Sequence, residues 1–95
     1  EYVDMKNFNT AKVTDMSNLF GGCASLEDVD LSGFNTAKTT NMNNMFYGCA
    51  SLTSLDLSGF SSKRLQSTTH MFTGIGALDT FLCTDTVILK AYRTR

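Results

Sequence analysis

The chain of 95 residues has no proline, no tryptophan and a single histidine. Its eight basic and nine acidic residues nearly cancel, to a net charge of −1 at pH 7. Neither nucleic acid nor an anionic membrane is therefore expected as a partner. The apolar runs are a few residues long, far short of the roughly 20 that span a bilayer. Zinc-type cysteine spacings, phosphate-binding glycine loops and nucleophile–histidine–acid patterns are also missing, so we expect no catalysis, no cofactor and no inserted segment.

The remaining composition is that of a globular domain. Hydrophobic residues make up 42% of the chain and charged residues 18%, which separates it from disordered sequences. Abundant Ser, Thr and Asn fit a secreted or surface-exposed protein. The chain begins at Glu1 in the middle of a pattern, so we expect a piece of a longer protein. The lack of a signal segment then says nothing about compartment.

A 26-residue repeat is the strongest signal in the sequence. Phe8, Phe34 and Phe60 are one period apart (34 − 8 = 60 − 34 = 26). Three further sets share this step: Phe20, Phe46 and Phe72; Gly22, Gly48 and Gly74; Leu26, Leu52 and Leu78. A fixed period of this length predicts stacked units, each unable to bury its own apolar face. Equivalent side chains should then lie over one another in a single continuous interior.

Each unit is predicted to contain one strand and one short helix. Leu55 and Leu57 alternate with polar residues, which is typical of a strand with one buried face. Equivalent strands are expected at Val3–Met5, Val29–Leu31 and Phe81–Cys83. The return segment 13–23 has apolar residues three to four apart, which predicts a helix of about two turns, capped by Thr14 and ended by Gly22.

These elements predict an α/β repeat solenoid, similar to a leucine-rich repeat, with short parallel strands on one face and short helices on the other. We expect one domain, residues 1–95, with units at about 3–28, 29–54 and 55–80 and a C-terminal cap at 81–95. Residues 86–92 are predicted to form a final cap strand, which would close an exposed sheet edge. Continuation of the array in a longer parent protein is an equally weighted alternative.

The repeated cysteines, Cys23 and Cys49, are predicted to be free and buried, whereas Cys83 has a different place in its unit, matching Leu31 and Leu57. Cys23 and Cys49 are one period apart (49 − 23 = 26), and Ile75 takes their place in the third unit. A position that accepts Cys, Cys and Ile is an apolar core site. Stacked neighbours could approach closely enough for a disulfide, but the odd cysteine count and Ile75 argue against one.

Two segments carry a resemblance to a known family. VTDMSNLFGGCASLEDVDLSGFNT and TTNMNNMFYGCASLTSLDLSGFSS strongly resemble the repeats of bacterial BspA-like leucine-rich-repeat surface proteins, also called mycoplasma-lipoprotein-type or lactobacillus surface-protein repeats. The resemblance covers roughly residues 3–83. It implies a cell-surface or secreted bacterial protein associated with adhesion or cell–cell contact. The Asn ladder of ordinary leucine-rich repeats is absent, with Phe34 and Phe60 in its place, and the family provides no fixed binding residues to transfer.

The candidate partner-binding surface is the polar face of the strands. Its members are Tyr2, Asp4, Asp28, Asp30, Ser54, Asp56, Thr80 and Leu82, with Lys6, Ser32 and Ser58 beside them. Neighbouring residues in a parallel sheet lie about 4.8 Å apart, so the column of Asp4, Asp30 and Asp56 costs on the order of 1 kcal/mol per pair. Solvated or locally hydrogen-bonded structural acids are the favoured interpretation, ahead of partner contact. Calcium is the least favoured, because three carboxylates in a line enclose an ion poorly.

Other repeated or single residues give weaker signals. The basic column of Lys12, Lys38 and Arg64 is interpreted as a solvated edge rather than a site for an anionic glycan or protein. His70 is expected to be a surface residue. Tyr2, Tyr47 and Tyr92 are expected to be exposed and suited to an interface.

The sequence therefore predicts a surface module that binds an extracellular protein or glycan. The alternative is a structural spacer that displays another domain and has no ligand of its own. An enzyme is the least favoured class, because a solenoid this short offers no deep cleft.

Overall fold

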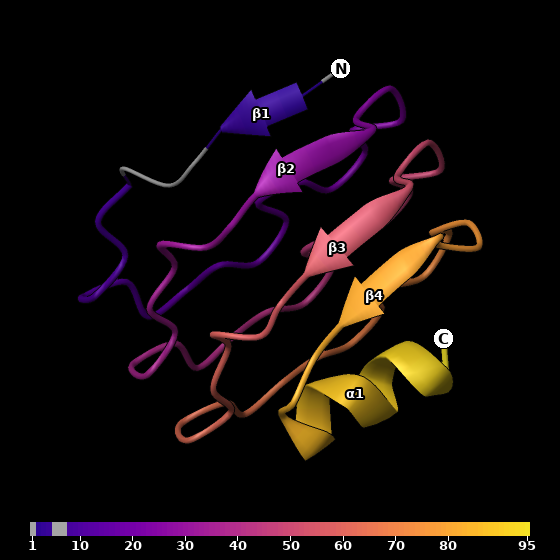
Figure 1. Cartoon of the computed structure of the whole chain (residues 1–95). Coiled ribbons are helices and arrows are strands. Elements are labelled where there is room, and N and C mark those ends of the chain that lie inside the picture. The colour runs from indigo at the N-terminus through magenta and orange to yellow at the C-terminus, as the bar shows by residue number, and fades with distance from the viewer. Residues whose placement is uncertain (1, 5–7) are drawn as a thin grey trace.

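The computed structural model describes residues 2–4, as backbone, and residues 8–95. Four three-residue strands lie side by side in chain order, and one helix follows them (Figure 1). They are β1 (Tyr2–Asp4), β2 (Asp28–Asp30), β3 (Ser54–Asp56), β4 (Thr80–Leu82) and α1 (Thr86–Arg93). β1 pairs in parallel with β2, and β3 with β4. β2 also contacts β3, where the Thr53 N–H donates to the Glu27 carbonyl oxygen at 3.0 Å. Short parallel strands are thus confirmed, each beginning one residue earlier than expected.

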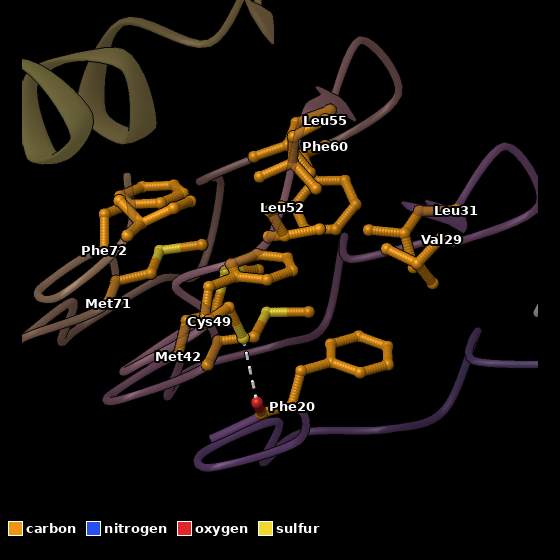
Figure 2. Packing of buried hydrophobic residues seen from close by; sticks show 14 of the residues in the cluster. Phe20, Val29, Leu31, Met42, Cys49, Leu52, Leu55, Phe60, Met71 and Phe72 are labelled. Carbon is orange, nitrogen blue, oxygen red and sulfur yellow. Dashed lines mark hydrogen bonds between the residues drawn. The ribbon is translucent and has the colours of Figure 1, made fainter. Parts of the chain in front are cut away.

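The interior is built from equivalent residues stacked on one another. The rings of Phe20, Phe46 and Phe72 form a column with centroids 5.6 and 5.7 Å apart and nearly parallel planes. Phe34 and Phe60 form a second column, 6.1 Å apart. Figure 2 shows the stacked aromatic, methionine and leucine side chains of successive units. Stacked units with a common interior, the central expectation from the repeat, are confirmed in these columns.

Phe8 is an exception to this stacking. The repeat predicts it in the column of Phe34 and Phe60, but its side chain is 60% exposed. Phe34 and Phe60 are buried. Phe8 belongs to the first unit, which has a stacked neighbour on one side. The prediction that all three rings lie in the core is therefore wrong at its first member.

The return segments are not helices, contrary to the expectation for residues 13–23. The N–H groups of Met16, Asn18, Phe20 and Gly22 donate to carbonyl oxygens of the second unit, at 2.7–2.9 Å. The intervening N–H groups of residues 19, 21 and 23 donate to the residue three positions earlier. An α-helix would instead direct each N–H to the residue four positions earlier.

Asparagine shapes these turns. Asn18 and Asn44 have φ values of 60° and 59°, and His70 has 56°. This left-handed conformation is tolerated best by Gly, Asn and Asp, and it interrupts a right-handed helix after a single turn. Thr14 therefore caps no helix. The apolar spacing of three to four residues, which predicted a helix, belongs here to a series of tight turns.

The C-terminal segment shows the opposite error, because the expected cap strand is the helix α1. Asp85 is its N-cap, with Oδ1 accepting the N–H groups of Val87 and Ile88 at 3.0 and 3.1 Å. Ile88 is fully buried, and Ala91 and Tyr92 pack against the core, which is the i, i+3, i+4 spacing of a helix face. The Tyr92 ring stacks on Phe81 at 3.8 Å and meets Phe72 edge-on.

Two equivalent threonines, here called the threonine ladder, form hydrogen bonds to the backbone of the next unit. The Thr10 hydroxyl donates to the Asn35 carbonyl oxygen at 3.1 Å and accepts the Asn35 N–H at 2.7 Å. Thr36 makes the same pair of bonds with Ser61, at 3.0 and 2.8 Å. Both threonines are buried. The sequence predicts core aromatics in place of the Asn ladder, but these hydrogen bonds between units come from threonine hydroxyl groups.

All three cysteines are free, as predicted, but their burial differs. Cys49 is fully buried, and its thiol donates to the Phe20 carbonyl oxygen at 3.0 Å (Figure 2). Cys23 is exposed and Cys83 is partly exposed. The expected burial of Cys23 is therefore wrong. Like Phe8, it lies in the first unit.

Candidate functional site

The strand row aligns the predicted surface residues in two columns. Strand pairing places Tyr2 beside Asp28 and Ser54 beside Thr80. In the second column it places Asp4 beside Asp30 and Asp56 beside Leu82. From β2 to β4 these side chains are exposed or partly exposed. The side chains of Tyr2 and Asp4, and all of Lys6, lie outside the described residues.

The carboxylates of the second column are held by local backbone donors. Asp30 Oδ1 accepts the Ser32 N–H at 3.0 Å, and Asp56 Oδ1 accepts the Ser58 N–H at 2.9 Å. Hydrogen bonds from the Ser58 hydroxyl and N–H hold the pKa of Asp56 below its usual value, although the nearby charge of Asp30 acts in the opposite direction. The cost of placing acids one above the other is thus offset by donors two residues along the chain.

The first column makes a direct contact between units. The Ser54 hydroxyl donates to Asp28 Oδ1 at 3.3 Å. Asp28, Asp30 and Asp56 line a shallow hollow of about 220 Å³ over β2, together with Val29, Leu31 and Ser32. Within the described part of the chain, no three His, Cys, Asp or Glu side chains are placed to hold a metal ion. The hollow offers carboxylate oxygens to hydrogen-bond donors or to a cationic side chain.

Leu82 and Tyr2 belong to strands at opposite edges of the row. Leu82 is 50% exposed on β4, whereas Tyr2 lies on β1, at the opposite edge of the row (Figure 1). Leu82 instead lies beside Asp56. The exposed face is therefore acidic over β2 and β3, whereas at β4 it presents Thr80 and Leu82.

The other predicted residues lie apart from this face. Lys12, Lys38 and Arg64 are all exposed. His70 is exposed, with Nδ1 3.3 Å from the Thr73 hydroxyl and its ring edge-on to Tyr47. Its placement at the surface agrees with the sequence.

Of the tyrosines expected at an interface, Tyr47 is exposed. Tyr92 is partly buried against Phe81, so the prediction that it is exposed is wrong. The reason is that Tyr92 lies on the face of α1 that packs against the core. Arg95 covers the Tyr92 ring at 4.0 Å.

Sequence reasoning missed the serines that fix the acidic side chains. Ser17, Ser32 and Ser58 each follow an aspartate by two residues, and each donates its N–H to that carboxylate. Aspartate commonly accepts a backbone N–H two residues on. The Asp-x-Ser pattern could therefore have been found in the sequence, and it would have favoured hydrogen-bonded structural acids.

Comparison with known proteins matches most of the chain to a family. The model of a family described as Mycoplasma protein of unknown function, DUF285, matches residues 2–84. No curated protein and no solved structure matches the chain. Among the described residues, no helix has the length and apolar character needed to cross a membrane.

Proposed function

The chain belongs to the Mycoplasma DUF285 family, and on this premise we propose that it is a bacterial surface or secreted module that binds an extracellular protein. In this proposal the stacked units form a short solenoid of the BspA-like leucine-rich-repeat type, with tight turns in place of return helices. The binding surface is the exposed face of β2, β3 and β4. The module performs no catalysis.

One observation carries the proposal, namely the alignment of outward side chains on adjacent parallel strands. Asp28, Asp30 and Asp56 surround one hollow, and exposed Leu82 lies beside Asp56. Stacked repeat proteins commonly bind partners on such extended surfaces. Because the Asp30 and Asp56 carboxylates are already oriented by Ser32 and Ser58, a partner would bind them with little loss of side-chain entropy. The charge favours a partner segment with Lys or Arg side chains next to an apolar group.

A spacer without a ligand is the second candidate. The observation in its favour is that Asp30 and Asp56 accept local N–H groups, so their presence can be explained by the turns alone. Removing the charge while keeping the turn separates the two functions. Asn is the suitable replacement, because Asn41 makes the same turn with the Asn43 N–H at 2.8 Å.

The test compares two isosteric variants. The Asp30→Asn, Asp56→Asn double variant removes both charges from the strand face. The matched control Asp15→Asn removes one charge from the same kind of turn, formed with Ser17, in a return segment. Binding is measured by surface plasmon resonance against immobilised laminin, fibronectin and collagen, at low and physiological salt.

We expect the double variant to bind at least ten-fold more weakly than the original chain. Its binding should also depend less on salt, because salt screens ion pairs and the variant has lost those made by Asp30 and Asp56. The Asp15→Asn control should bind like the original chain. Equal binding by all three proteins would exclude the strand face as the binding surface. No binding by any of them to these proteins would favour the spacer. Biotinylation of intact cells tests the surface location separately.

A further inference from the structure

We propose that a hollow between the third unit and the end of α1 binds a tetrahedral oxyanion, that is, a sulfate or phosphate group. This hollow, here called the third-unit hollow, has a volume of about 180 Å³, and its polar lining residues are Thr68, His70, Thr73, Thr94 and Arg95. None of these residues belongs to the exposed face of β2, β3 and β4. The proposal therefore stands or falls independently of partner binding by the strands.

The first observation is a row of backbone N–H groups without an acceptor. In the first unit, the N–H groups of residues 16, 18, 20 and 22 donate to the second unit, and in the second unit those of residues 42, 44, 46 and 48 donate to the third. The equivalent N–H groups of residues 68, 70, 72 and 74 donate to no described residue. Thr68, His70 and Phe72, which carry three of these four groups, line the third-unit hollow. Backbone N–H groups gathered in a concavity attract anions.

Helix α1 packs on this side of the third unit, where the Tyr92 ring meets Phe72 edge-on, but its carbonyl oxygens are not directed at the N–H row. The Lys90 carbonyl oxygen accepts the N–H and the hydroxyl of Thr94, at 3.0 and 2.9 Å. The Tyr92 carbonyl oxygen accepts the Arg95 guanidinium at 2.7 Å. The negative end of the helix dipole is thus covered by its own donors, and the N–H row faces the hollow.

The second observation is the charge of the lining. Arg95 and His70 line the third-unit hollow, and among the described residues no Asp or Glu does. The Arg95 guanidinium lies over the Tyr92 ring, 4.0 Å from its centroid, and spends one N–H on the Tyr92 carbonyl oxygen. A guanidinium has five N–H donors in a fixed plane, so several remain for a ligand while the ring holds the group in place. Arginine held in this way is well suited to phosphate and similar anions.

The third observation is that the repeat changes at residues that line the hollow. Thr68 stands where the second unit has Met42, and His70 where it has Asn44 (68 − 42 = 70 − 44 = 26). The first change brings a hydroxyl group, and the second brings an imidazole. The φ of His70, 56°, matches the 59° of Asn44, so the turn is kept. Nδ1 of His70 lies 3.3 Å from the Thr73 hydroxyl, and an imidazole whose Nδ1 accepts a hydroxyl carries its proton on Nε2, as a further donor.

The size of the third-unit hollow limits its occupant to a small group. Drug-sized ligands bind in pockets of about 300–1,000 Å³, which is larger than this hollow. A phosphate group presents three strong acceptor oxygens in a compact shape, and a sulfate group has the same tetrahedral form. Such a group can accept hydrogen bonds from the N–H row and from Arg95 at the same time. It can be a free ion or the ester of a larger molecule that remains outside the hollow.

The test titrates the full chain with sodium sulfate and with sodium phosphate, at an ionic strength held constant with sodium chloride. Backbone amide signals are followed by proton–nitrogen correlation NMR. Arg95→Gln removes the charge of the guanidinium. His70→Asn introduces the residue found at the equivalent position of both other units, so the turn is preserved. The matched control Arg93→Gln removes the same charge from a residue of α1 that does not line the hollow.

We expect saturable shifts at the amides of Thr68, His70 and Phe72. Arg95→Gln should raise the dissociation constant about ten-fold, the effect expected for loss of one charge-assisted hydrogen bond. His70→Asn should also weaken binding, whereas Arg93→Gln should bind like the original chain. Amide signals outside the hollow that stay in place show that each variant remains folded.

Three results would overturn the proposal. The first is a set of shifts that rise linearly with anion concentration and spread over exposed basic residues such as Lys12 and Lys38, which would show an adventitious ion only. The second is equal weakening by Arg93→Gln and Arg95→Gln. The third is an affinity that neither Arg95→Gln nor His70→Asn changes.

A second titration distinguishes a free ion from an ester. Methyl phosphate and methyl sulfate are compared with the inorganic ions, and methanol serves as the uncharged control. Tighter binding of an ester, with the same amides shifted, supports the site and assigns it to the charged group of a larger molecule. Tighter binding of the inorganic ion supports the site and assigns it to the free ion. Shifts of the same size with methanol would overturn the proposal, because the hollow would then not require an anion.

Discussion

At the scale of single residues, the cysteines show how much the environment of a repeated position depends on its neighbours. Cys23 and Cys49 have the same place in successive units, yet one is exposed and the other is buried. Burial raises the pKa of the Cys49 thiol, and it also raises that of Cys83. Because the thiolate is the reactive species, Cys49 is protected both by its burial and by its raised pKa.

These differences predict an order of reactivity in the native protein. Iodoacetamide at pH 8 should modify Cys23 fastest, Cys83 more slowly, and Cys49 only when the protein unfolds. The measurement is a time course by peptide mass spectrometry, with the same chain in 6 M guanidinium, about the strength that unfolds even hyperstable proteins, as the reference in which the three rates converge. Native modification of Cys49 as fast as Cys23 would contradict the packing around Phe20.

Column membership could be predicted from the sequence, whereas exposure could not. The spacing of Phe20, Phe46 and Phe72 was sufficient to predict their stacking. The exposure of Phe8 was not predictable in this way, because it depends on whether a unit lies on each side. Thr36 was overlooked because its polar side chain suggests the surface, although its hydroxyl is fully used by Ser61.

At the scale of elements, one carboxylate joins the last unit to α1. Asp85 Oδ2 accepts the Ser62 N–H at 2.7 Å, while Oδ1 accepts two N–H groups of the first helical turn. Ser62 is the equivalent of Thr36 (62 − 36 = 26). Thr36 bonds to the backbone of the next unit, whereas Ser62 bonds to the carboxylate of Asp85. Burial alone would raise the pKa of Asp85, but hydrogen bonds from Ile88, Ser62 and Val87 outweigh it and lower the pKa.

Two substitutions separate the roles of Asp85. Asp85→Ala loses the N-cap, which costs about 0.5–2 kcal/mol in the free energy of unfolding, and it also leaves the Ser62 N–H without its acceptor. Asp85→Asn keeps an N-cap of similar quality but loses the charge and the second oxygen. Urea unfolding at pH 7 should therefore rank the original chain above Asp85→Asn and Asp85→Ala last. Equal stability of Ala and Asn variants would show that the cap contributes nothing.

The lowered pKa of Asp85 predicts that the stability of the protein depends on pH. A carboxyl group whose pKa is lower in the folded state stabilises the protein above its unfolded-state pKa, about 3.9. That contribution is lost as the pH falls below this value and through the folded-state pKa. The difference between the original chain and Asp85→Asn should thus be constant near neutral pH and shrink below pH 4. If the difference in the free energy of unfolding persisted at the lowest pH, it would come from packing and not from the charge of Asp85.

The strands were predictable because one face is buried, so alternation fixes them. The return segments were not, because the same three-to-four spacing suits a helix and a chain of tight turns. Hydrogen bonds to the next unit, such as that from the Met16 N–H to the Asn41 carbonyl oxygen, favour the tight turns. The local sequence pattern does not predict these bonds. The alternation of Val87 and Leu89 predicts a strand over residues 86–92, whereas the N-cap at Asp85 is a local signal for the helix that forms.

At the scale of the whole molecule, the candidate surface was largely predictable, since it follows from strand alternation and the period. What the sequence could not supply was the separation of Tyr2 from Leu82 at opposite edges of the row, because that depends on the number of stacked units between them. The sequence also did not predict that the helix α1 covers the third unit at one end of the molecule, while the first unit forms the other end. The two ends therefore differ in chemistry although the units between them are alike.

Rows of backbone hydrogen bonds join each unit to the next, which favours collective unfolding. Phe46 is fully buried between Phe20 and Phe72, and its N–H donates to the Met71 carbonyl oxygen at 2.9 Å. Helix α1, with eight residues, is too short to persist alone. Loss of the middle unit should thus release both of its neighbours.

We accordingly predict a single unfolding transition that shifts as a whole when the middle ring is truncated. Phe46→Ala should cost about 3–5 kcal/mol, whereas the exposed Phe8→Ala should stay within about 0.5 kcal/mol. Urea curves from circular dichroism and from pulsed alkylation of Cys49 should coincide for each protein, as expected for a two-state domain of this size. If Cys49 in the Phe46→Ala variant became reactive well before the circular dichroism signal changed, the units would unfold separately. The repeat would then determine how the chain packs without making the stacked units one cooperative structure.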